Sequence, residues 1–394
     1  MPMRIIIGTE SFSPNISGVA IVVELLAKNL AKKGHEVCVV APSRDYGTHW
    51  DESFEEFSVL RIRSFPNPFR NGFRIALLPQ GEIYRAAREF RPDIVHLHDP
   101  ASISTSLRKA CKIIGVPVVV TNHFGLDYAL SYVRYLSPLH PQMRTILIWY
   151  LVRFYNQCDY VLCPTQTVRH ELESWGVATP IEAVSNGVDL ERFFSYASPA
   201  AVRSKYHLPP DPIVLYVGRV DKDKSLEVLI RAIPRVMKES SAHFVIVGNG
   251  DELSKLKARA EKLGVARRVS FLGWIDHESP DLCRLYQIAS VFAIPSTIET
   301  QSIVTLEALA SGLPVVAADG GALPELVEDG GNGFLFRPGD SEGLGARIVN
   351  ILKDDNLARQ TRRKSLEIVS RHHISESFAR LESIYEEVRQ AATQ

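Results

Sequence analysis

Two cations in the second half of the sequence stand where they could hold a phosphate group. Arg219 and Lys224 lie in the segment GRVDKDKS, directly after the apolar run 213–217 and just ahead of a helical stretch. A helix N-terminus offers unpaired backbone N–H groups to anions, and guanidinium and ammonium groups add charge-assisted hydrogen bonds. The spacing therefore suits a diphosphate, although two solvated surface cations would produce the same pattern.

Two carboxylates further along the chain could bind hydroxyl groups. Glu299 and Glu307 lie in STIETQSIVTLEALASGLPVV, after the apolar run 291–294. On one continuous helix they would stand about 80° apart, at about 100° per residue. If the helix instead begins near Ser302, Glu299 can meet a ligand at the strand end while Glu307 lies along the helix wall. Both could then grip hydroxyls of one extended ligand, whereas Glu307 taken alone would be read as a surface residue of a helix.

A loop near the N-terminus offers a third candidate contact. The segment TESFSPNISGVA follows the apolar run 5–7, and Ser17 and Gly18 come just before a helix expected to begin near Val19. Small residues there leave backbone N–H groups open to an anion, but an ordinary strand-to-helix turn capped by Ser17 has the same sequence. The loop is not Gly-x-Gly-x-x-Gly, so no dinucleotide fingerprint is present. The run VGNGD, with Gly248, follows another strand and is a weak signal.

No metal site is expected from the residue pattern. His96 and His98 in VHLHDP stand two apart at a strand end, but no third ligand is in register, so a structural role is the better interpretation. The Asp-x-Asp pair, Asp221 and Asp223, lies between the two cations expected to bind phosphate. Fixed cations and a helix N-terminus can stabilise charge on a leaving phosphate in place of a divalent ion. We therefore expect neither a metal nor another cofactor.

Short β-branched runs alternate with helical stretches along the whole chain. The runs are Arg4–Ile7, Glu36–Val40, Ile94–Leu97, Val116–Thr121, Tyr160–Cys163, Ile213–Val217, Phe244–Val247, Val269–Leu272, Val291–Ile294 and Pro314–Ala317. This alternation predicts parallel sheets covered on both faces. Because the Pro- and Ala-rich segment 195–212 separates two such series, the α/β chain is predicted to form two doubly wound Rossmann-like domains, residues 1–200 and 210–374. Ligands bind at the carboxyl ends of such strands, which places the expected site in a cleft between the domains.

Composition excludes several other classes of protein. The 394 residues carry 45 basic and 45 acidic side chains, so nothing global indicates a nucleic-acid binder, which is typically basic. The cysteines at positions 38, 111, 158, 163 and 283 form no zinc pattern, and scattered thiols favour a reducing compartment. The longest strongly apolar stretch, Ile146–Val152, is shorter than the roughly 20 residues that a bilayer requires. We therefore expect a cytoplasmic protein, at most peripheral on the inner face of the membrane, whose oligomeric state the sequence leaves open.

Five strings occur in an order that resembles a known family. They are SNGVDLERF, GRVDKDKS, VGNGD, FLGWI and ETQSIVTLEALASGLPVVA. Together they resemble the retaining family-4 glycosyltransferases of the GT-B fold, and the resemblance extends from ESFSPNISGV to the last helix. It implies a C-terminal helix, residues 375–394, that packs back on the N-terminal domain. The order RIRSFPNPFRNGFRIALLP, HLHDP and TNHF is most similar to the branch that acts on diacylglycerol and other lipid acceptors.

On the donor side, the resemblance assigns roles to residues that match the family's motifs. Arg219 and Lys224 would hold the donor diphosphate. Glu299 would bind hydroxyls of the donor sugar, and Glu307 would bind the ribose. The remaining donor contacts would come from Gly18, Gly218, Gly248, Gln301, Ser302, Ile303 and Val304. The family often has glycine where this chain has Ser225 and Ser302, and a side chain at position 302 would narrow the sugar pocket.

On the acceptor side, the resemblance implies contacts from Ser17, Gly18 and His123, the last in TNHF. The residues implied in catalysis are His123, Glu299, Arg219 and Lys224. The acceptor hydroxyl would attack from the face that the phosphate leaves, with the departing phosphate as base, so the anomeric configuration would be retained. A UDP-sugar is the usual donor in the lipid branch. GDP-mannose with a phosphoinositide or polyprenyl acceptor is the main alternative.

Three other functional classes fit part of the pattern. A glycoside hydrolase could use Glu299 and Glu307 as acid and nucleophile, but it would need no diphosphate clamp. A nucleotide-sugar isomerase would interconvert the donor without any acceptor. A non-catalytic sensor would bind the donor without turning it over.

Basic and aromatic residues interleave in two stretches that lack acidic residues. One lies between Asp127 and Asp159 and includes Trp149 among its arginines, and the other, 61–74, holds four arginines and three phenylalanines. Cations that meet lipid phosphates and rings at headgroup level would dock the N-terminal domain on an anionic membrane. The same apolar spacing would also serve the packing of a long helix into the core.

Overall fold

The computed structural model of this chain divides into two compact units. It describes residues 2–15, 17–67, 73–77, 79–126, 139–194 and 199–393. The first unit comprises Met1–Ser185 and Ser377–Gln394, and the second comprises Asn186–Glu376.

The segment expected to join the domains, 195–212, lies within the second unit. Its described part includes helix α8 (Pro199–Lys205), which packs on α11 (Pro280–Ile288). Val202 is buried there, and the ammonium of Lys205 bonds to the carboxylate of Asp281. The segment therefore folds with the second unit, although its proline content indicated a linker.

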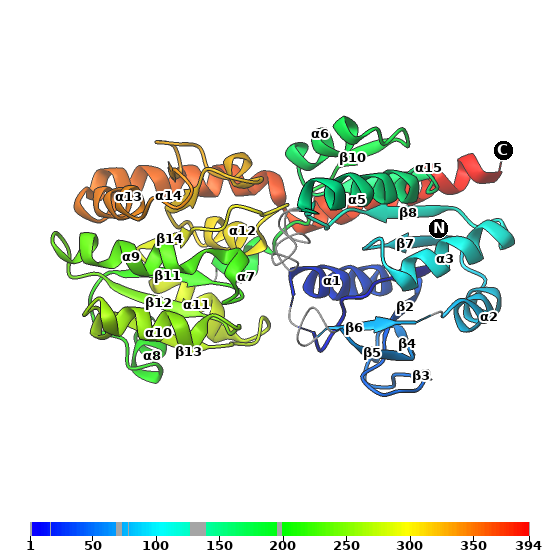
Figure 1. Cartoon of the computed structure of the whole chain (residues 1–394), viewed down its shortest axis with the longest axis horizontal. Coiled ribbons are helices and arrows are strands. Elements are labelled where there is room, and N and C mark those ends of the chain that lie inside the picture. Colours follow the sequence, from blue (N-terminus) through cyan, green and yellow to red (C-terminus); the bar gives the residue numbers. More distant parts are fainter. Residues whose placement is uncertain are drawn as a thin grey trace. The chain divides into compact units, whose positions relative to one another are not determined.

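The first unit is built on an eight-stranded sheet in the order β10-β9-β8-β7-β1-β2-β4-β3 (Figure 1). The strands are β1 (Arg4–Gly8), β2 (Glu36–Pro42), β3 (His49–Trp50), β4 (Ser58–Ile62), β7 (Ile94–Leu97), β8 (Val118–Thr121), β9 (Tyr160–Cys163) and β10 (Ile181–Ala183). All neighbouring pairs are parallel except β3 with β4. A separate antiparallel pair joins β5 (Ser64–Pro66) to β6 (Arg74–Ala76).

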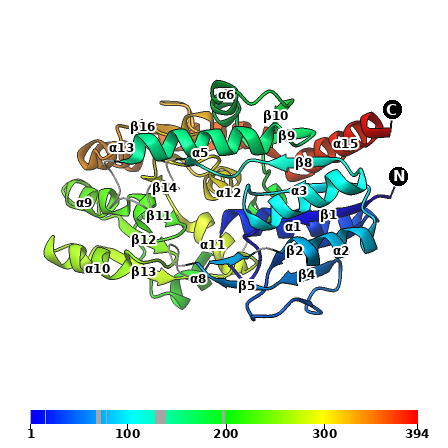
Figure 2. The same cartoon turned by 45° about the vertical axis from the view of Figure 1, so that its right-hand side comes forward.

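Helices pack on this sheet, and one of them arrives from the C-terminal end of the chain. They are α1 (Gly18–Lys32), α2 (Gln80–Phe90), α3 (Ser102–Ile114), α5 (His140–Tyr155), α6 (Gln166–Trp175) and α15 (Ile374–Thr393). The hydroxyl of Tyr385 on α15 lies 2.6 Å from Nδ1 of His96 on β7. Arg380 also bonds Glu182 of β10 at 2.7 Å. The expected return of the C-terminal helix to the N-terminal domain is thus confirmed (Figure 2).

The second unit contains a six-stranded, wholly parallel sheet in the order β13-β12-β11-β14-β15-β16. Its strands are β11 (Ile213–Val217), β12 (His243–Val247), β13 (Val269–Gly273), β14 (Val291–Ile294), β15 (Val315–Ala318) and β16 (Gly333–Phe336). Its helices, besides α8 and α11, are α7 (Leu190–Phe194), α9 (Leu226–Met237), α10 (Leu253–Lys262), α12 (Ile303–Ala310), α13 (Ser341–Lys353) and α14 (Asp355–Val369). Each predicted strand of both units is confirmed, and so is the doubly wound architecture.

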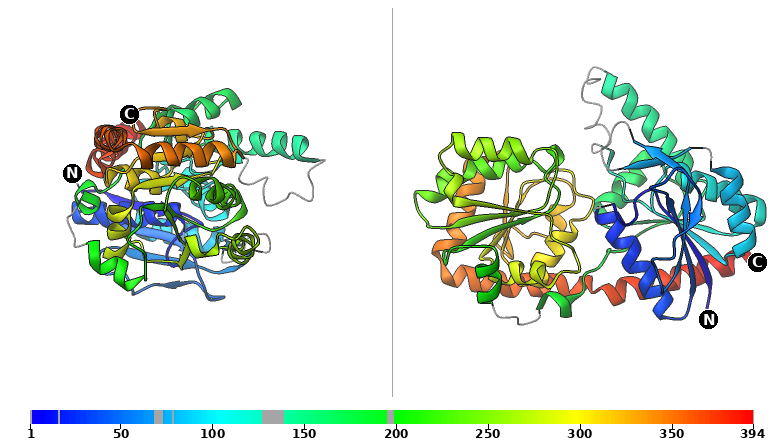
Figure 3. Two further views of the ribbon diagram at one scale, coloured as in Figure 1. Left: turned by 90° about the vertical axis from the view of Figure 1, so that its left-hand side faces the viewer. Right: turned by 90° about the horizontal axis from the view of Figure 1, so that it is seen from below.

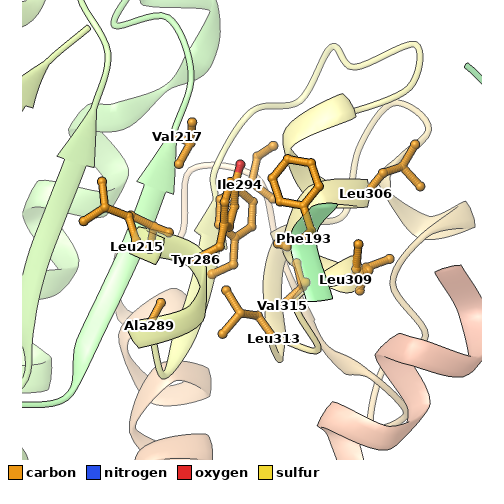
Figure 4. Packing of buried hydrophobic residues seen from close by; sticks show 14 of the residues in the cluster. Phe193, Leu215, Val217, Tyr286, Ala289, Ile294, Leu306, Leu309, Leu313 and Val315 are labelled. Carbon is orange, nitrogen blue, oxygen red and sulfur yellow. The ribbon is translucent and has the colours of Figure 1, made fainter. Parts of the chain in front are cut away.

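Helices cover both faces of this sheet (Figure 3), and alternate residues of β11 belong to the two cores on either side. Val214 and Tyr216 belong to a core shared with α9, α10 and α13. Leu215 and Val217 belong to the opposite core, which includes Phe193 of α7 and side chains of α11 and α12 (Figure 4). A strand buried on both faces leaves its ends as the places where polar side chains can reach solvent. The loops at the carboxyl ends of the strands are therefore where a ligand site can form.

All five cysteines are buried, and none of them forms a disulfide. Among the described residues, no helix is both long and apolar enough to cross a bilayer.

Candidate active site

The loops after β11 and β14 bring one predicted cation and one predicted carboxylate into contact. These strands are neighbours in the sheet, and Nζ of Lys224 lies 2.6 Å from Oε1 of Glu299. Their side chains are only 18% and 12% exposed. Burial acts to raise the pKa of Glu299, but the charge and hydrogen bond of Lys224 outweigh it and hold that pKa below its usual value. Glu299 is therefore an ionised hydrogen-bond acceptor at neutral pH.

Arg219 completes this cluster from the same loop. Its guanidinium bonds the carboxylate of Asp221 and donates to Oδ2 of Asp223 at 2.7 Å. Both carboxylates of the Asp-x-Asp pair thus bind the same arginine, and the side chain of Asp223 is only 3% exposed. Among the described residues, no group of three or more His, Cys, Asp or Glu side chains is arranged to hold a metal. The cluster consists of two cations and three carboxylates, held in place by their mutual bonds.

Two of the predicted donor residues, Gly218 and Gly248, lie against each other at the ends of β11 and β12. Their φ angles are 147° and 136°. A Cβ placed on Gly248 would lie 1.8 Å from the carbonyl oxygen of Gly218. Any side chain at position 248 would therefore push the two loops apart, so glycine is required for this close approach.

Ser225 occupies a backbone conformation that favours glycine. Its φ is 52° and its ψ is 30°, in the left-handed region, where it joins the short 3-10 turn Lys222–Lys224 to α9. This is a position where the resemblance led us to expect glycine. A residue with a Cβ is strained there by about 1–2 kcal/mol. The chain keeps the turn that carries Lys224 in spite of this cost.

Helix α12 begins near Ser302, so Glu299 and Glu307 do not share one continuous helix. Ser302 is its N-cap, and Oγ of Ser302 accepts a hydrogen bond from the backbone N–H of Thr305 at 3.3 Å. The side chain of Gln301 accepts from the backbone N–H of Asn186 at 2.8 Å. Ile303 begins the helix, and Val304 follows it. The side chains of Gln301 and Ser302 are buried, so the backbone is the part of this segment that a ligand could reach.

Glu307, on α12, is separated from Glu299 and has its own partners. Its Oε1 lies 2.8 Å from Nε2 of His277, and its Oε2 accepts a hydrogen bond from the hydroxyl of Tyr286 at 2.7 Å. Figure 4 shows Tyr286 among the apolar side chains of this core. Burial lowers the pKa of His277, but its bonds to Glu278 and Glu307 outweigh this and raise the pKa to about 9. His277 is therefore a partly buried cation beside Glu307 at neutral pH, and Glu307 belongs to the wall of the site.

Three residues of this site escaped the sequence analysis. His277 lies in the loop after β13. A histidine just beyond a strand end was the sequence feature that could have identified it. Tyr286 lies in an amphipathic helix, where nothing distinguishes it from a core residue. A Cβ on Gly321 would lie 2.6 Å from the carbonyl oxygen of Glu299, so Gly321 lets the loop after β15 support Glu299. The pattern in the sequence that could have indicated Gly321 was a pair of glycines, Gly320–Gly321, shortly after a strand.

The predicted acceptor residues lie at the carboxyl edge of the first unit's sheet. Ser17 caps α1, which begins at Gly18, and Oγ of Ser17 accepts from the backbone N–H of Ala20 at 3.1 Å. His123 follows β8, and its Nε2 lies 3.1 Å from Nδ1 of His98. The buried His98 thus bonds another side chain, and in the part of the chain that the structure describes it belongs to no metal-ligand set. Its partner, His123, is itself one of the predicted acceptor residues. Among the described residues, no side-chain hydrogen bond joins Ser17 to His123.

A partly buried pair of acids, Glu10 and Asp99, holds the loop that carries Ser17. The backbone N–H of Glu10 donates to Asp99 at 2.5 Å, and the carboxylate of Glu10 accepts from the backbone N–H of Ile103 at 2.9 Å. Burial, reinforced by the charge of Asp99, raises the pKa of Glu10 to about 7. The pair ties the loops after β1 and β7 to the start of α3. The sequence analysis did not identify it.

Comparison with known proteins agrees with this arrangement of fold and site. Residues 16–192 match the family described as Glycosyltransferase Family 4, and residues 201–367 match Glycosyl transferases group 1. Two tandem doubly wound units are the GT-B architecture of glycosyltransferases. Sucrose-phosphate synthase from Thermosynechococcus elongatus superimposes on 98% of this chain and 99% of its own, with a TM-score of 0.79 and 21% identity. The chain belongs to the family-4 glycosyltransferases.

Several curated relatives are similar over most of the chain. Alpha-monoglucosyldiacylglycerol synthase of Acholeplasma laidlawii is 28% identical over 97% of this chain and 96% of its own. A GDP-mannose-dependent alpha-mannosyltransferase of Corynebacterium glutamicum is 29% identical over 90% of this chain and 81% of its own. The sulfoquinovosyl transferase SQD2 of Arabidopsis thaliana is 29% identical over 84% of this chain, which spans 62% of that longer protein.

The His277–Glu307 pair predicts a pH-dependent contribution to stability. Because its pKa rises on folding to about 9, His277 stabilises the fold fully below about pH 6.5, its unperturbed value, and loses this effect as pH rises through about 9. His277→Gln should lower the free energy of unfolding by about 1.5–3 kcal/mol at pH 6, and the difference should shrink toward pH 10. Urea denaturation of both proteins measures it. His170→Gln, at an exposed position of α6, is the control and should change stability by less than about 0.5 kcal/mol. A difference that stays constant from pH 6 to pH 10 would contradict the assignment.

Proposed function

We propose that this chain transfers a hexose from a UDP-sugar to a hydroxyl group of a membrane lipid such as diacylglycerol. In this proposal the anomeric configuration is retained and no metal is required. The observation that carries it is the contact of Lys224 with Glu299 beside Arg219, at the carboxyl ends of neighbouring strands. Such a cluster offers cations to a diphosphate and an ionised carboxylate to sugar hydroxyls within one small volume.

The cations would act on the leaving group. As the bond between the anomeric carbon and the diphosphate lengthens, negative charge grows on the phosphate. Arg219 and Lys224 would then exchange part of their carboxylate bonds for phosphate oxygens, and the N-terminus of α12 would add backbone N–H groups. Since Asp221 and Asp223 both bond Arg219, they support a role in orienting that cation rather than in binding a metal.

The two glutamates would bind the donor at different places. Glu299 would accept hydrogen bonds from hydroxyls of the sugar, because its pKa is held low and it stays ionised. Glu307 would accept from the ribose hydroxyls. Each carboxylate oxygen has two lone pairs, so the bonds from His277 and Tyr286 leave one on each oxygen.

The protonation of Glu299 favours a transferase over a glycoside hydrolase. A hydrolase needs one carboxylic acid whose pKa is raised, so that it can protonate the leaving group. Glu299 has a lowered pKa and an ammonium group as partner. Its environment therefore suits a permanent acceptor of hydrogen bonds.

The lipid acceptor is supported by the relatives. Two alpha-monoglucosyldiacylglycerol synthases match 93% and 97% of this chain, and by name they make a glucosylated diacylglycerol. The GDP-mannose-dependent alpha-mannosyltransferases, 28% and 29% identical, favour a second candidate, a mannosyltransferase that uses GDP-mannose.

A transfer assay tests the proposed reaction. The purified chain, dialysed against EDTA, is incubated with radiolabelled UDP-glucose, UDP-galactose or GDP-mannose and total membrane lipid. We expect a UDP-hexose to give a labelled α-linked glycolipid at the same rate with and without EDTA, because fixed cations neutralise the leaving group.

Other outcomes of this assay would contradict parts of the proposal. Labelling from GDP-mannose alone would establish the second candidate, and a β-linked product would exclude retention. Loss of activity in EDTA that magnesium or manganese restores would show that a metal is needed. Donor interconverted without acceptor would identify an isomerase, and donor binding without turnover a sensor.

Helix α5 presents an exposed apolar face that supports membrane docking. Ile146 and Trp149 are 65% and 63% exposed, and the guanidinium of Arg153 lies 6.0 Å from the ring centroid of Trp149. The core side of α5 is formed by Leu151 and its neighbours. The alternative that Ile146 and Trp149 pack into the core is therefore wrong.

Of the three described arginines in the second acid-free stretch, 61–74, Arg63 is exposed and the other two bond groups of the same unit. Arg61 is buried, and it bonds Asp51 at 2.9 Å and the backbone carbonyl of Ser13 at 2.7 Å. Arg74 bonds Ser64 at 2.8 Å. Residues 68–72 of this stretch lie outside the described residues, as do 127–138 of the first one. The docking proposal therefore rests on α5.

Vesicle binding tests this surface. Ile146→Ser together with Trp149→Ser should weaken sedimentation with phosphatidylglycerol–phosphatidylcholine vesicles by at least about tenfold, because each apolar side chain contributes up to about 1.5–3 kcal/mol when buried. Trp50→Ser is the matched control, since Trp50 is 54% exposed on the edge strand β3. Binding should also fall at high salt and be weak to phosphatidylcholine alone. Equal binding to both vesicle types, or equal effects of the two variants, would rule out this face.

A further inference from the structure

The histidines at the carboxyl ends of β7 and β8 form a connected set. Nδ1 of His98 lies 3.1 Å from Nε2 of His123, and the two rings are nearly parallel, at 8°. The ring of His96 lies against that of His98, with centroids 4.1 Å apart. His96 is held in turn by Thr121 and Tyr385, at 2.7 and 2.6 Å.

The number of N–H groups on the two rings restricts how His98 and His123 can hydrogen-bond to each other. Burial lowers the pKa of His123 to about 4. Burial, with the charges of His96 and His123, lowers the pKa of His98 well below its usual value. Both rings are therefore neutral at pH 7, and a neutral imidazole carries one N–H. One ring must donate to the other.

The surroundings of His98 indicate which ring donates. His98 is 2% exposed, and among the residues that the structure describes nothing bonds to its buried Nε2. If His123 donated, the single proton of His98 would sit on this Nε2 as a buried, unpaired donor. If His98 donates from Nδ1, its Nε2 carries only a lone pair. Unpaired buried N–H groups are rarer in proteins than unpaired acceptors, so the second arrangement is favoured.

We propose that His98 is a positioning residue that fixes His123 in its Nδ1–H tautomer, so that His123 donates a hydrogen bond to a substrate oxygen and does not act as a base. Its Nε2 lone pair is already engaged, which leaves Nδ1–H as the polar group of the ring. His96 imposes neither tautomer, because both of its partners are hydroxyls that can donate or accept. Its ring supports that of His98.

This inference rests on the proposed function, because that function identifies the substrate oxygen to which His123 would donate a hydrogen bond. In the reaction, the bond from the anomeric carbon to the diphosphate oxygen breaks, and its electron pair stays on that oxygen. The new bond forms from the acceptor oxygen to the anomeric carbon. The proton of the acceptor hydroxyl passes to the departing phosphate, so no protein base is needed. An N–H hydrogen-bond donor on His123 would stabilise a substrate oxygen on which negative charge develops during the transfer.

The tautomer can be observed directly by NMR. In the full chain labelled with ¹⁵N-histidine, long-range ¹H–¹⁵N correlations of the ring distinguish Nδ1–H from Nε2–H, and the His123→Gln spectrum assigns the signals. We expect Nδ1–H at His123 in the wild type and in His98→Asn, whose amide can donate at the same place. His98→Asp can only accept when ionised, so it should shift His123 to Nε2–H. Finding Nε2–H at His123 in the wild type would overturn the proposal.

Transfer rates provide the second readout. His98→Asp and His98→Leu should lower kcat by roughly 100-fold, the size expected for one misplaced preorganised donor, while the donor Kd stays unchanged. His98→Asn should recover most of the rate. If His98→Asp does not fold, the comparison of Asn with Leu still decides, and equal rates for these two would overturn the proposal. Absence of sugar transfer by the wild type would instead refute the proposed function and leave the NMR result to decide the tautomer.

Discussion

The ion pair between Lys224 and Glu299 is the contact on which the donor side of this protein depends. It joins the loops that follow two neighbouring strands, β11 and β14, whose own residues are buried on both faces of the sheet. Because the pair is mostly shielded from water, the attraction is stronger than at an open surface. It keeps Glu299 ionised where burial alone would favour the protonated acid. Loss of either partner would leave a buried charge uncompensated, so folding and function share this constraint.

The polar side chains at the sites of the two units are stabilised in different ways. In the second unit every charged group of the site has an opposite charge or a hydroxyl beside it, as Arg219 has Asp223 and Glu307 has His277. A polyanionic ligand can then replace carboxylates around cations that are already in place. In the first unit burial lowers the pKa of His98 and His123, so both are neutral, and the acids Glu10 and Asp99 bond each other's loops. These two histidines therefore need no opposite charge beside them.

The sequence was sufficient for the architecture because parallel strands covered on both faces are nearly continuous apolar runs. The spacing of the two glutamates left the start of α12 open, and the structure places it at Ile303, with Ser302 as the N-cap. Strands β4, β10 and β16 were not predicted: β4 (SVLRI) and β10 (IEA) include polar residues, and β16 (GFLF) is only four residues long and begins with glycine. Partners such as His98 with His123 and His277 with Glu307 lie 25 and 30 residues apart, so only the folded chain brings them together. The burial of Arg61, and the packing of α8 that draws 199–205 into the second unit, are likewise tertiary effects.

The central claim is that Arg219 and Lys224 hold the diphosphate of a nucleotide sugar. Its most direct test is the kcat/KM for the donor in Arg219→Ala and Lys224→Ala, with Lys262→Ala, at an exposed position of α10, as the matched loss of a cation elsewhere. Each site variant removes charge-assisted hydrogen bonds worth about 1.5–3 kcal/mol, so kcat/KM should fall roughly 10- to 150-fold, while Lys262→Ala stays at the wild-type value. Wild-type kinetics in both site variants would contradict the account.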